Sequence, residues 1–297
     1  MPETTTQNAI EFRNVSLSFE DQPALIDVSF ELRRGEMIFL TGEAGAGKSV
    51  LLLLAMGLLK PDAGEIFIGG VEIETLNESA LLAIRGGLMG MVFQEDSLFT
   101  GMSVYDNAAY RLEEHGWTEE EIQKAVNEVL KFVGLDGEEE KFPEELSGGM
   151  KRRLEIARAL IGWPSIMLFD EPTMGLDPIV AVQVLDLLIR ARDVYQISSL
   201  FVTKKLYELP YLANYIALNE AGGKIIICEA PPGGLPKARI MMLEAGRIVF
   251  SGNLAEFQVC DLPAVKRLLA LDPHDHSADP YFADPWDRTR RAKERIL

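Results

Sequence analysis

The sequence predicts an α/β fold around a mostly parallel β-sheet, on three observations. Short apolar segments of the kind that form buried strands recur along the chain, for example at residues 36–40 and 165–170. Segments with helical periodicity separate them, and strands separated by helices favour parallel pairing. A glycine-rich turn at residues 42–47 directly follows the first of these two strands and leads into an apolar, helix-like stretch.

The N-terminal part is expected to consist mainly of strands. Residues 10–40 contain partial alternation of apolar and polar side chains, followed by the short run EMIFL, which is typical of a buried strand. Residues 64–75 are expected to form a hairpin around Gly69-Gly70, since paired glycines mark a turn.

The rest of the chain alternates helical and strand-like segments. Residues 96–160 are helical and charged, and Thr118 and Glu121 have the spacing of a capping box at a helix start. A Gly/Pro-rich break lies within residues 219–238, which we expect to be an insertion. The other predicted elements are a strand at 165–170, a helix at 178–193, a strand at 198–203 and a strand–turn–strand unit at 240–252.

The glycine-rich turn matches the phosphate-binding pattern G-x-x-x-x-G-K-S. In this pattern the glycines let backbone N–H groups surround phosphate oxygens, the Lys reaches the β- and γ-phosphates, and the Ser hydroxyl ligates Mg²⁺. The alternative is a chance glycine turn, but the flanking strand and helix are the context that the motif requires. The predicted nucleotide-binding residues here are Gly42, Glu43, Ala44, Gly45, Ala46, Gly47, Lys48, Ser49 and Val50.

Two carboxylates, Asp170 and Glu171, end the apolar strand at residues 165–170. Asp170 can hold Mg²⁺, together with Ser49, and Glu171 is placed to polarise an attacking water as a general base. An acidic pair at a strand end is also typical of a solvated turn, but the phosphate-binding motif upstream makes that interpretation the minor one. The sequence therefore predicts Mg²⁺-dependent hydrolysis of a nucleoside triphosphate.

Charge and composition exclude several classes of function. The formal net charge is −17, and so acidic a chain argues against nucleic acid as a partner and against direct binding to an anionic membrane. The two cysteines, Cys228 and Cys260, form neither a disulfide framework nor a zinc motif. No secretory signal is visible, and the longest near-continuous apolar run, residues 50–59, falls short of the roughly 20 residues that cross a bilayer. For work at a membrane, another chain would have to supply the spans.

The string Leu146-Ser147-Gly148-Gly149-Met150 narrows the class further. Here the chain resembles the ATP-binding cassette (ABC) ATPases, whose signature is LSGGQ. In that family the signature lies at a helix N-terminus and binds the γ-phosphate held by the opposite subunit, so the resemblance implies ATP sandwiched in a homodimer. Ser147 would also suit a plain helix cap. Arg152 and Arg153 are expected to be exposed on the helix that follows, with a role in holding nucleotide in the dimer as the alternative.

The resemblance assigns three further residues by position. Gln94 matches a glutamine that contacts Mg²⁺ and senses the transmembrane partner. Asp177, in Met174-Gly175-Leu176-Asp177, matches an aspartate that lies near the opposite phosphate-binding loop. Phe19 matches the aromatic residue that stacks on adenine, with a strand core residue as the alternative.

One family residue is replaced. The family has a switch His where this chain has Lys204, and the spacing of His115, His274 and His276 does not let them substitute. An ammonium can stabilise the γ-phosphate but cannot accept a hydrogen bond, and beside Glu171 it would form an ion pair that lowers the basicity of the carboxylate. We therefore expect slow but real turnover, with Glu171 as the base and Lys204 as an electrostatic clamp.

The resemblance also implies the architecture. It covers residues 8–257 and implies the ABC-ATPase fold of P-loop NTPases, with a RecA-like core, an antiparallel β subdomain and an α-helical subdomain inserted at about 96–160. Residues 258–297 are a C-terminal extension, expected to lack its own core from about Asp272 onward. That segment is either a disordered end or an arm that docks on a neighbouring subunit.

Within the family, several stretches look like the ATPases of Mla/Mce-type bacterial lipid transporters. These are SLSFEDQPALIDVSFEL, GMVFQEDSLFTGMSVYDNAAYRL, ELSGGMKRR and DEPTMGLDP. This resemblance implies a transmembrane permease, a second copy of the ATPase and a periplasmic lipid-binding Mce-domain protein as partners. It also implies a peripheral position at the cytoplasmic face of the inner membrane. The departures from the pattern are Lys204 and the insertion at 219–238.

Two alternatives stay open beside lipid transport. The chain could power an ABC transporter for another substrate, such as amino acids or a drug. Because of Lys204, it could also be a nucleotide-gated module with little turnover. The sequence does not identify the substrate, the direction of transport, the permease, or the roles of the insertion and the tail.

Overall fold

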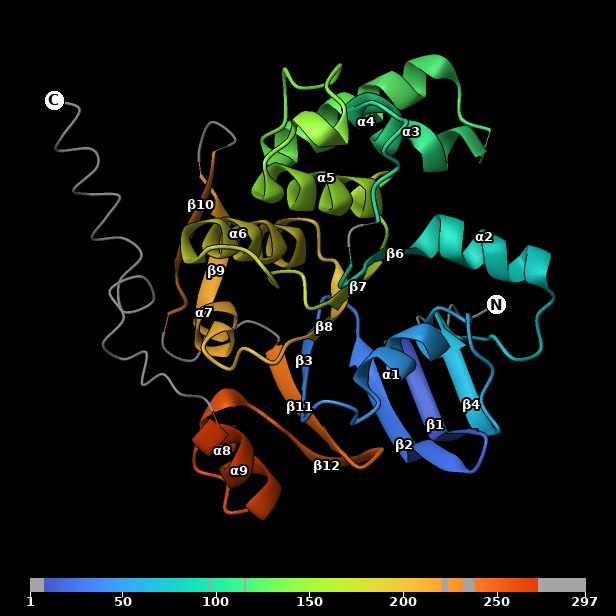
Figure 1. Cartoon of the computed structure of the whole chain (residues 1–297), viewed down its shortest axis with the longest axis vertical. Coiled ribbons are helices and arrows are strands. Elements are labelled where there is room, and N and C mark those ends of the chain that lie inside the picture. Colours follow the sequence, from blue (N-terminus) through green and yellow to red (C-terminus); the bar gives the residue numbers. More distant parts are fainter. Residues whose placement is uncertain (1–7, 96, 115, 221–223, 232–237, 272–297) are drawn as a thin grey trace, which may run out of the picture.

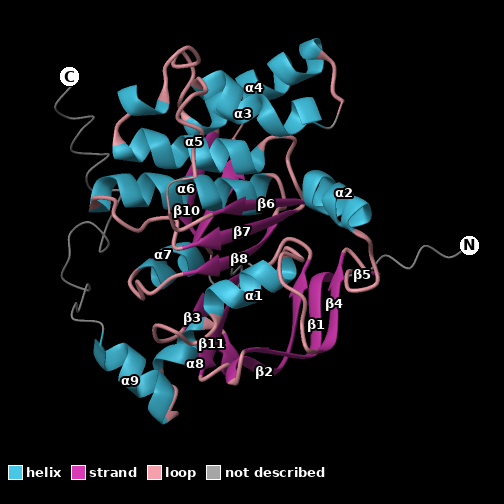
Figure 2. Ribbon diagram, turned by 45° about the vertical axis from the view of Figure 1, so that its right-hand side comes forward, coloured by secondary structure: helices cyan, strands magenta, loops and turns pink. Residues whose placement is uncertain are grey.

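The computed structural model describes residues 8–95, 97–114, 116–220, 224–231 and 238–271. Its centre is a six-stranded sheet in which only the pair β11–β12 is antiparallel (Figure 1, Figure 2). The predicted parallel α/β sheet is therefore confirmed. In sheet order the strands are β12 (Arg247–Gly252), β11 (Ala238–Glu244), β3 (Met37–Thr41), β8 (Ser198–Val202), β7 (Ile166–Asp170) and β6 (Met89–Val92).

The central strands β3, β7 and β8 are fully buried and mostly apolar because both of their faces are covered. Side chains alternate between two cores: Met37 and Phe39 of β3 lie in one, and Ile38 and Leu40 lie in the other. The first core is closed by α5 (Gly148–Leu160) and α6 (Pro178–Val194), and the second by α1 (Lys48–Ala55).

A separate antiparallel sheet lies on the far side of α1 (Figure 2). Its strands in order are β2 (Gln22–Arg33), β1 (Asn8–Phe19), β4 (Ala63–Ile68) and β5 (Val71–Glu72). The pair β4–β5 is the hairpin expected around Gly69-Gly70, and both glycines have positive φ, 59° and 86°. This sheet is the predicted β subdomain, and it holds α1 against the central sheet.

The predicted helical region contains α3 (Val104–Glu114), α4 (Glu119–Val133), the 3₁₀ turn η1 (Pro143–Glu145) and α5. Thr118 and Glu121 form the expected capping box of α4. The prediction that Arg152 is exposed is wrong. Its side chain is buried, pairs with Glu155 and donates to the carbonyls of Phe93 and Gln94. A buried guanidinium is tolerated because these partners satisfy it.

The remaining elements complete the surface: α2 (Glu78–Leu88), α7 (Glu208–Asn214), β9 (Tyr215–Asn219), β10 (Ile225–Glu229), α8 (Leu254–Gln258) and α9 (Pro263–Leu271). Val265 of α9 is fully buried in the larger core, so part of the C-terminal extension packs on the main body. The tail from Asp272 and all three histidines lie outside the described residues. Within the described ranges, every helix is too short or too polar for a bilayer crossing.

Candidate nucleotide-binding and hydrolytic site

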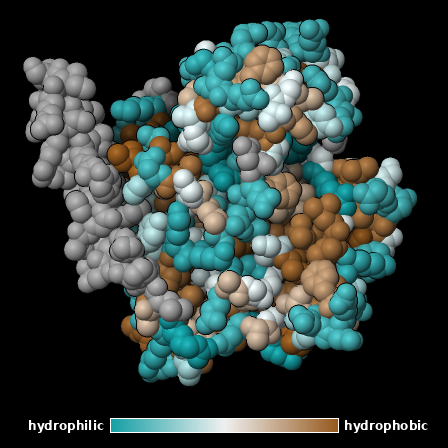
Figure 3. Space-filling view, viewed as in Figure 1, coloured by the Kyte–Doolittle hydropathy of each residue, from teal (hydrophilic) through white to brown (hydrophobic). Residues whose placement is uncertain are grey.

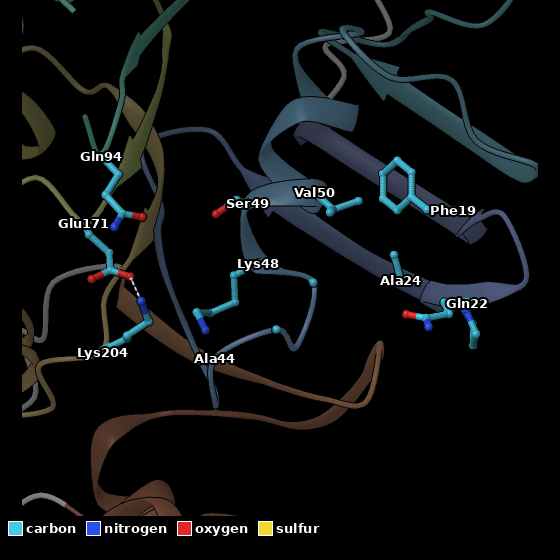
Figure 4. A pocket seen from close by; sticks show the side chains of 13 residues that line it. Phe19, Gln22, Ala24, Ala44, Lys48, Ser49, Val50, Gln94, Glu171 and Lys204 are labelled. Carbon is cyan, nitrogen blue, oxygen red and sulfur yellow. Dashed lines mark ion pairs between the residues drawn. The ribbon is translucent and has the colours of Figure 1, made fainter. Parts of the chain in front are cut away.

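A cavity of about 380 Å³ opens where the glycine-rich turn meets the ends of the central strands. It is bounded on one side by β1, β2 and α1, and on the other by the segments that follow β6, β7 and β8 (Figure 4). The edge formed by the carboxyl ends of parallel strands is where α/β sheets bind ligands. The lining residues are Phe19, Gln22, Pro23, Ala24, Ala44, Gly45, Gly47, Lys48, Ser49, Val50, Gln94, Glu171 and Lys204.

The turn between β3 and α1 requires glycine for two reasons. Its glycines have positive φ angles, and at Gly42 and Gly47 another backbone segment comes too close for a Cβ atom. Gly42 has φ 140°, and a Cβ there would lie 2.1 Å from the carbonyl oxygen of Leu243. Gly47 has φ 102°, and its Cβ would lie 2.6 Å from the carbonyl oxygen of Ala24. Gly45, with φ 79°, would meet nothing within 4 Å among the described atoms. The turn is therefore pressed against its surroundings at both ends and open at its middle, a shape that admits a phosphate chain.

Lys48 begins α1 and is buried beneath this turn. Its Nζ donates to the carbonyl oxygens of Gly42 and Glu43, at 2.7 Å and 2.8 Å. Burial lowers the pKa of Lys48, and the nearby positive charge of Lys204 lowers it further. The nearby Glu171 and Asp170 carboxylates act in the opposite direction. A buried ammonium whose hydrogen-bond partners among the described residues are neutral carbonyls still gains from a bound anion, so the site is electrostatically suited to phosphate.

Asp170 at the end of β7 has a carboxylate oxygen, Oδ1, that is buried without a hydrogen-bond partner among the described residues. Burial raises the pKa of Asp170, while a hydrogen bond with Ser49 acts in the opposite direction. An unsatisfied buried carboxylate next to a Ser hydroxyl fits a hard cation such as Mg²⁺, which prefers oxygen ligands. Gln94, the third predicted ligand, lines the cavity, and its amide nitrogen lies 3.1 Å from Sδ of Met174.

Glu171 is held in an unusual backbone conformation. Its φ is 47°, the left-handed region that a non-glycine residue rarely adopts, and its N–H donates to the carbonyl of Val202 at 3.0 Å. Residues held in such regions cluster at functional sites. The carboxylate forms an ion pair with Lys204 on the same side of the cavity, Nζ to Oε1 at 2.5 Å (Figure 4). The expected proximity of Lys204 and Glu171 is thus observed.

The two members of this ion pair differ in exposure. The Glu171 side chain is 10% exposed and that of Lys204 is 45% exposed. Glu171 is therefore the buried member of the pair, and Lys204 is the solvent-facing one.

Phe19 lies at the opposite end of the cavity, beside Val50 and Ala24 (Figure 4). It is 48% exposed, so it is not the strand core residue of the alternative interpretation. An exposed aromatic face at a cavity mouth can stack on a planar base.

The signature residues lie away from the cavity. Ser147 caps α5, with Oγ accepting from the N–H of Met150 at 3.3 Å, and both Ser147 and Gly148 are exposed. Asp177 caps α6 in the same way and is also exposed. The capping roles are therefore observed, and one chain does not bring these residues to the phosphate turn.

Sequence reasoning missed some residues around the site. Gln22 and Pro23 line the cavity from the β1–β2 turn, and no local motif marks them. Glu208, in α7, is fully buried against the segments that follow β7 and β8. No local sequence signal marks Glu208, because its burial depends on contacts with Thr173 and Thr203 that form only in the fold.

Comparison with known proteins agrees with this geometry. The family model described as ABC transporter matches residues 25–174, just over half of the chain. A methionine import ATP-binding protein of Carboxydothermus hydrogenoformans is 40% identical over 199 residues, which cover 67% of this chain and 59% of that protein. A probable ribonucleotide transport ATP-binding protein of Mycobacterium leprae is 45% identical over 172 residues, 58% of this chain and 49% of that protein. The matches therefore span about half to three fifths of these relatives.

Among solved structures, the dimeric ATP-binding cassette MJ0796 bound to ADP and Pi is similar with a TM-score of 0.68. It is 26% identical, and the match covers 82% of this chain and 98% of that one. The fold is thus the predicted ABC ATPase fold. The family match, the fold and the cavity together show that this chain belongs to the ABC transporter family, as an ATPase of the ABC type.

Proposed function

We propose that this chain is the ATP-hydrolysing subunit of an ABC transporter and works as a pair of copies. The observation that carries the proposal is the convergence, in one cavity, of the phosphate turn, Lys48, Ser49 and Glu171, with Asp170 hydrogen-bonded to Ser49 at the end of β7. ATP supplies the adenine, ribose and phosphates that this elongated cavity fits, from Phe19 at one end to Lys204 at the other.

The binding roles follow the geometry. The N–H groups of the turn and Lys48 would bind the β- and γ-phosphates, and Phe19 would stack on the adenine. Ser49, Asp170 and Gln94 would hold Mg²⁺, which when bound neutralises the charge that develops on the phosphates. The unpartnered oxygen of Asp170 supports this assignment.

Hydrolysis would use Glu171 as the general base. A water attacks the γ-phosphorus, Glu171 accepts a proton from that water, and the bond from the γ-phosphorus to the β–γ bridging oxygen breaks, with ADP as the leaving group. Lys204 would stabilise the negative charge on the γ-phosphoryl group. Since Lys204 also binds Glu171, it would have to give up part of that ion pair before the base can accept a proton, and this supports slow turnover.

A second copy would complete each site. The family resemblance assigns to the opposite subunit's nucleotide the exposed residues Ser147, Gly148 and Asp177, together with the half-buried Gly149. Their distance from the cavity lining within one chain supports this division. The solved cassette MJ0796 is described as dimeric in its ADP- and Pi-bound state.

A transmembrane permease is the proposed second partner. Figure 3 shows an apolar area on the face where Figure 1 places α1, with α2 beside it. Leu58, after α1, and Leu82 and Leu88 of α2 are exposed. Exposed apolar patches mark interaction sites, and docking there would keep the chain at the cytoplasmic face of the membrane that holds the permease. We also propose that the ATPase domain comprises residues 8–257 and that residues 258–297 form a C-terminal extension.

The transported substrate is either a small polar molecule such as an amino acid, or a lipid. A relative described as a methionine import protein, 40% identical, favours the alternative over the lipid-transport interpretation, that is, an importer of an amino acid or a similar small polar molecule. Lipid transport and an Mce-domain partner rest on the sequence resemblance alone. We therefore propose import of a small polar substrate first and lipid transport second.

The test is turnover of Mg-ATP by the purified full chain and by its Glu171→Gln variant. Glutamine keeps the shape of the side chain but is not a base at neutral pH, so turnover should fall about 10²- to 10⁴-fold while ATP affinity stays. Wild-type turnover in the variant would contradict the assignment of the base. Co-expression with a candidate permease, followed by ATPase stimulation with amino acids or with phospholipid, separates the two substrate classes.

A further inference from the structure

Glu208 is the first residue of α7, and its side chain is completely buried. It does not line the nucleotide cavity. One carboxylate oxygen accepts a hydrogen bond from the hydroxyl of Thr173, and the other accepts from the hydroxyl of Thr203 at 2.9 Å. Glu208 therefore joins two segments that are 30 residues apart in sequence.

Those two segments carry the chemistry. Thr173 lies two residues after Glu171, and Thr203 lies immediately before Lys204. The backbone hydrogen bond from Glu171 to Val202 fixes the strand ends themselves. The two bonds to Glu208 fix the residues beyond the strand ends, where the chain has left the sheet and the ladder no longer constrains it.

Lys205 completes the network. Its Nζ donates to the carbonyl oxygen of Thr173 at 2.7 Å and lies 3.8 Å from Oε1 of Glu208. Burial raises the pKa of the Glu208 carboxyl, and the nearby charge of Glu171 also acts to raise it. The Thr173 and Thr203 hydroxyls and Lys205 act to lower it. A carboxyl buried at such a cost is retained where its hydrogen bonds specify a geometry.

We propose that Glu208 is a positioning residue for ATP hydrolysis, which sets the separation between Glu171 and Lys204 by holding Thr173 and Thr203 from one rigid carboxyl group. This inference rests on the proposed function and deepens it. Because Glu208 is buried and does not line the nucleotide cavity, its removal should affect the alignment of the base and the clamp, and leave the phosphate turn unchanged.

The first experiment measures ATP affinity and turnover separately in the full chain. Glu208→Ala should reduce turnover by about 10- to 100-fold, because small misplacements of reacting groups have effects of that size. ATP affinity should change by less than about twofold, since no ATP-binding group is removed. Glu208→Gln, which keeps one acceptor oxygen, should retain more turnover than Glu208→Ala.

A matched control is another side-chain hydrogen bond that holds α7, the one between Tyr211 and Asp186. Asp186 of α6 accepts a hydrogen bond from Tyr211 of α7, so Asp186→Ala also loosens α7 but leaves Thr173 and Thr203 alone. This control should keep turnover near the wild-type value. A double-mutant cycle adds the decisive comparison: in a Lys204→Ala background, Glu208→Ala should reduce turnover by less than about threefold, because the pair it aligns is already broken.

A second readout needs no turnover. The lysine amines are reductively methylated with ¹³C, and the Lys204 signal is assigned by its loss in Lys204→Ala. Glu171→Gln and Glu208→Ala should move this signal in the same direction, because both disturb the ion pair, and Asp186→Ala should not move it. If Glu208→Ala fails to fold, Thr203→Val, which removes one of the two hydroxyl donors, takes its place in every arm.

Several results would overturn the inference. They are wild-type turnover in Glu208→Ala, a loss that Asp186→Ala reproduces, a loss that adds fully to that of Lys204→Ala, or an unchanged Lys204 signal. Failure of the proposed function would be distinguishable, since turnover would then be insensitive to Glu171→Gln whatever the Lys204 signal did in Glu208→Ala.

Discussion

The phosphate turn and the signature helix are both built on a glycine-rich string before a helix, yet they differ in what surrounds them. The turn at Gly42 and Gly47 is enclosed, with Cβ positions that would collide with the backbone of β11 and β2. The start of α5 is exposed, and a Cβ on Gly148 would meet no described atom within 4 Å.

This difference shows how the site is divided. One chain brings together the residues that we propose bind the nucleotide, including Lys48, Glu171 and Phe19, in one cavity. The signature glycine has room around it that the fold of one chain does not use. Its small size therefore serves something outside the chain, which we propose is the nucleotide of a second copy. The proposed site thus has an enclosed half, the phosphate turn and its cavity, and an exposed half, the signature at the start of α5. Substitutions in the two halves should have different effects.

The enclosed half should respond most strongly to Lys48→Ala. The variant removes a charged donor to the β- and γ-phosphates, an interaction of about 1.5–3 kcal/mol, so ATP affinity should fall about 10- to 100-fold and turnover should be lost. Calorimetry measures the affinity, and circular dichroism checks that the chain still folds. ATP binding and turnover equal to wild type would remove the turn from the site.

The exposed half should respond to Gly148→Asp in turnover alone. The substitution has open space around it, so folding and ATP affinity of the single chain should stay, while turnover should fall by at least about tenfold through repulsion of the opposite γ-phosphate. Gly149→Ala is the matched contrast, since its Cβ would lie 2.5 Å from Cγ1 of Val180 and should lower stability instead. Thermal unfolding and turnover distinguish the two.

Lys204 pairs with the proposed base, Glu171, and is proposed to stabilise the γ-phosphoryl group. Lys204→Ala should reduce turnover by about tenfold or more, because it removes a charge that stabilises the transition state, with a smaller loss of ATP affinity. Lys204→His should be active, since imidazole can both donate and accept. Unchanged turnover in Lys204→Ala would mean that the site stabilises its γ-phosphate without this residue.

The smallest effect is on stability, at Asp170. Its pKa is raised in the folded chain, so above that pKa the carboxylate is ionised in both states and the folded state bears the cost of burying it. Asp170→Asn should therefore raise the melting temperature of the nucleotide-free chain at neutral pH by about 2–4 °C per kcal/mol gained. The gain should disappear as the pH falls below the pKa of an unfolded aspartate. Mg-ATP should stabilise the wild type more than the variant, which differential scanning fluorimetry can follow.

The elements and the main catalytic groups could be predicted because their signals are local. The pattern from Gly42 to Ser49, the acidic end of β7 and the alternating apolar runs are each contained in a few neighbouring residues. The ion pair of Lys204 with Glu171 was predictable from family spacing. Arg152 was not, because its partners, the carbonyls of Phe93 and Gln94, lie about 60 residues earlier in the chain.

Glu208 shows the same limit at the site itself. Its environment is set by Thr173 and Thr203, which come from two different strand ends that meet only in the folded sheet. A surface acid at a helix start and this buried carboxyl have the same local sequence signature. Such residues emerge only when the topology is known.

The most direct test of the divided site is to mix two inactive variants. Lys48→Ala keeps a good signature, and Gly148→Asp keeps a good phosphate turn, so a mixed pair contains one site with both halves intact. If half of the pairs are mixed and each has one such site, turnover should recover to about a quarter of the wild-type value, as expected for a symmetric dimer with shared sites. No recovery from two well-folded variants, or full turnover by the Gly148→Asp chain alone, would contradict the account.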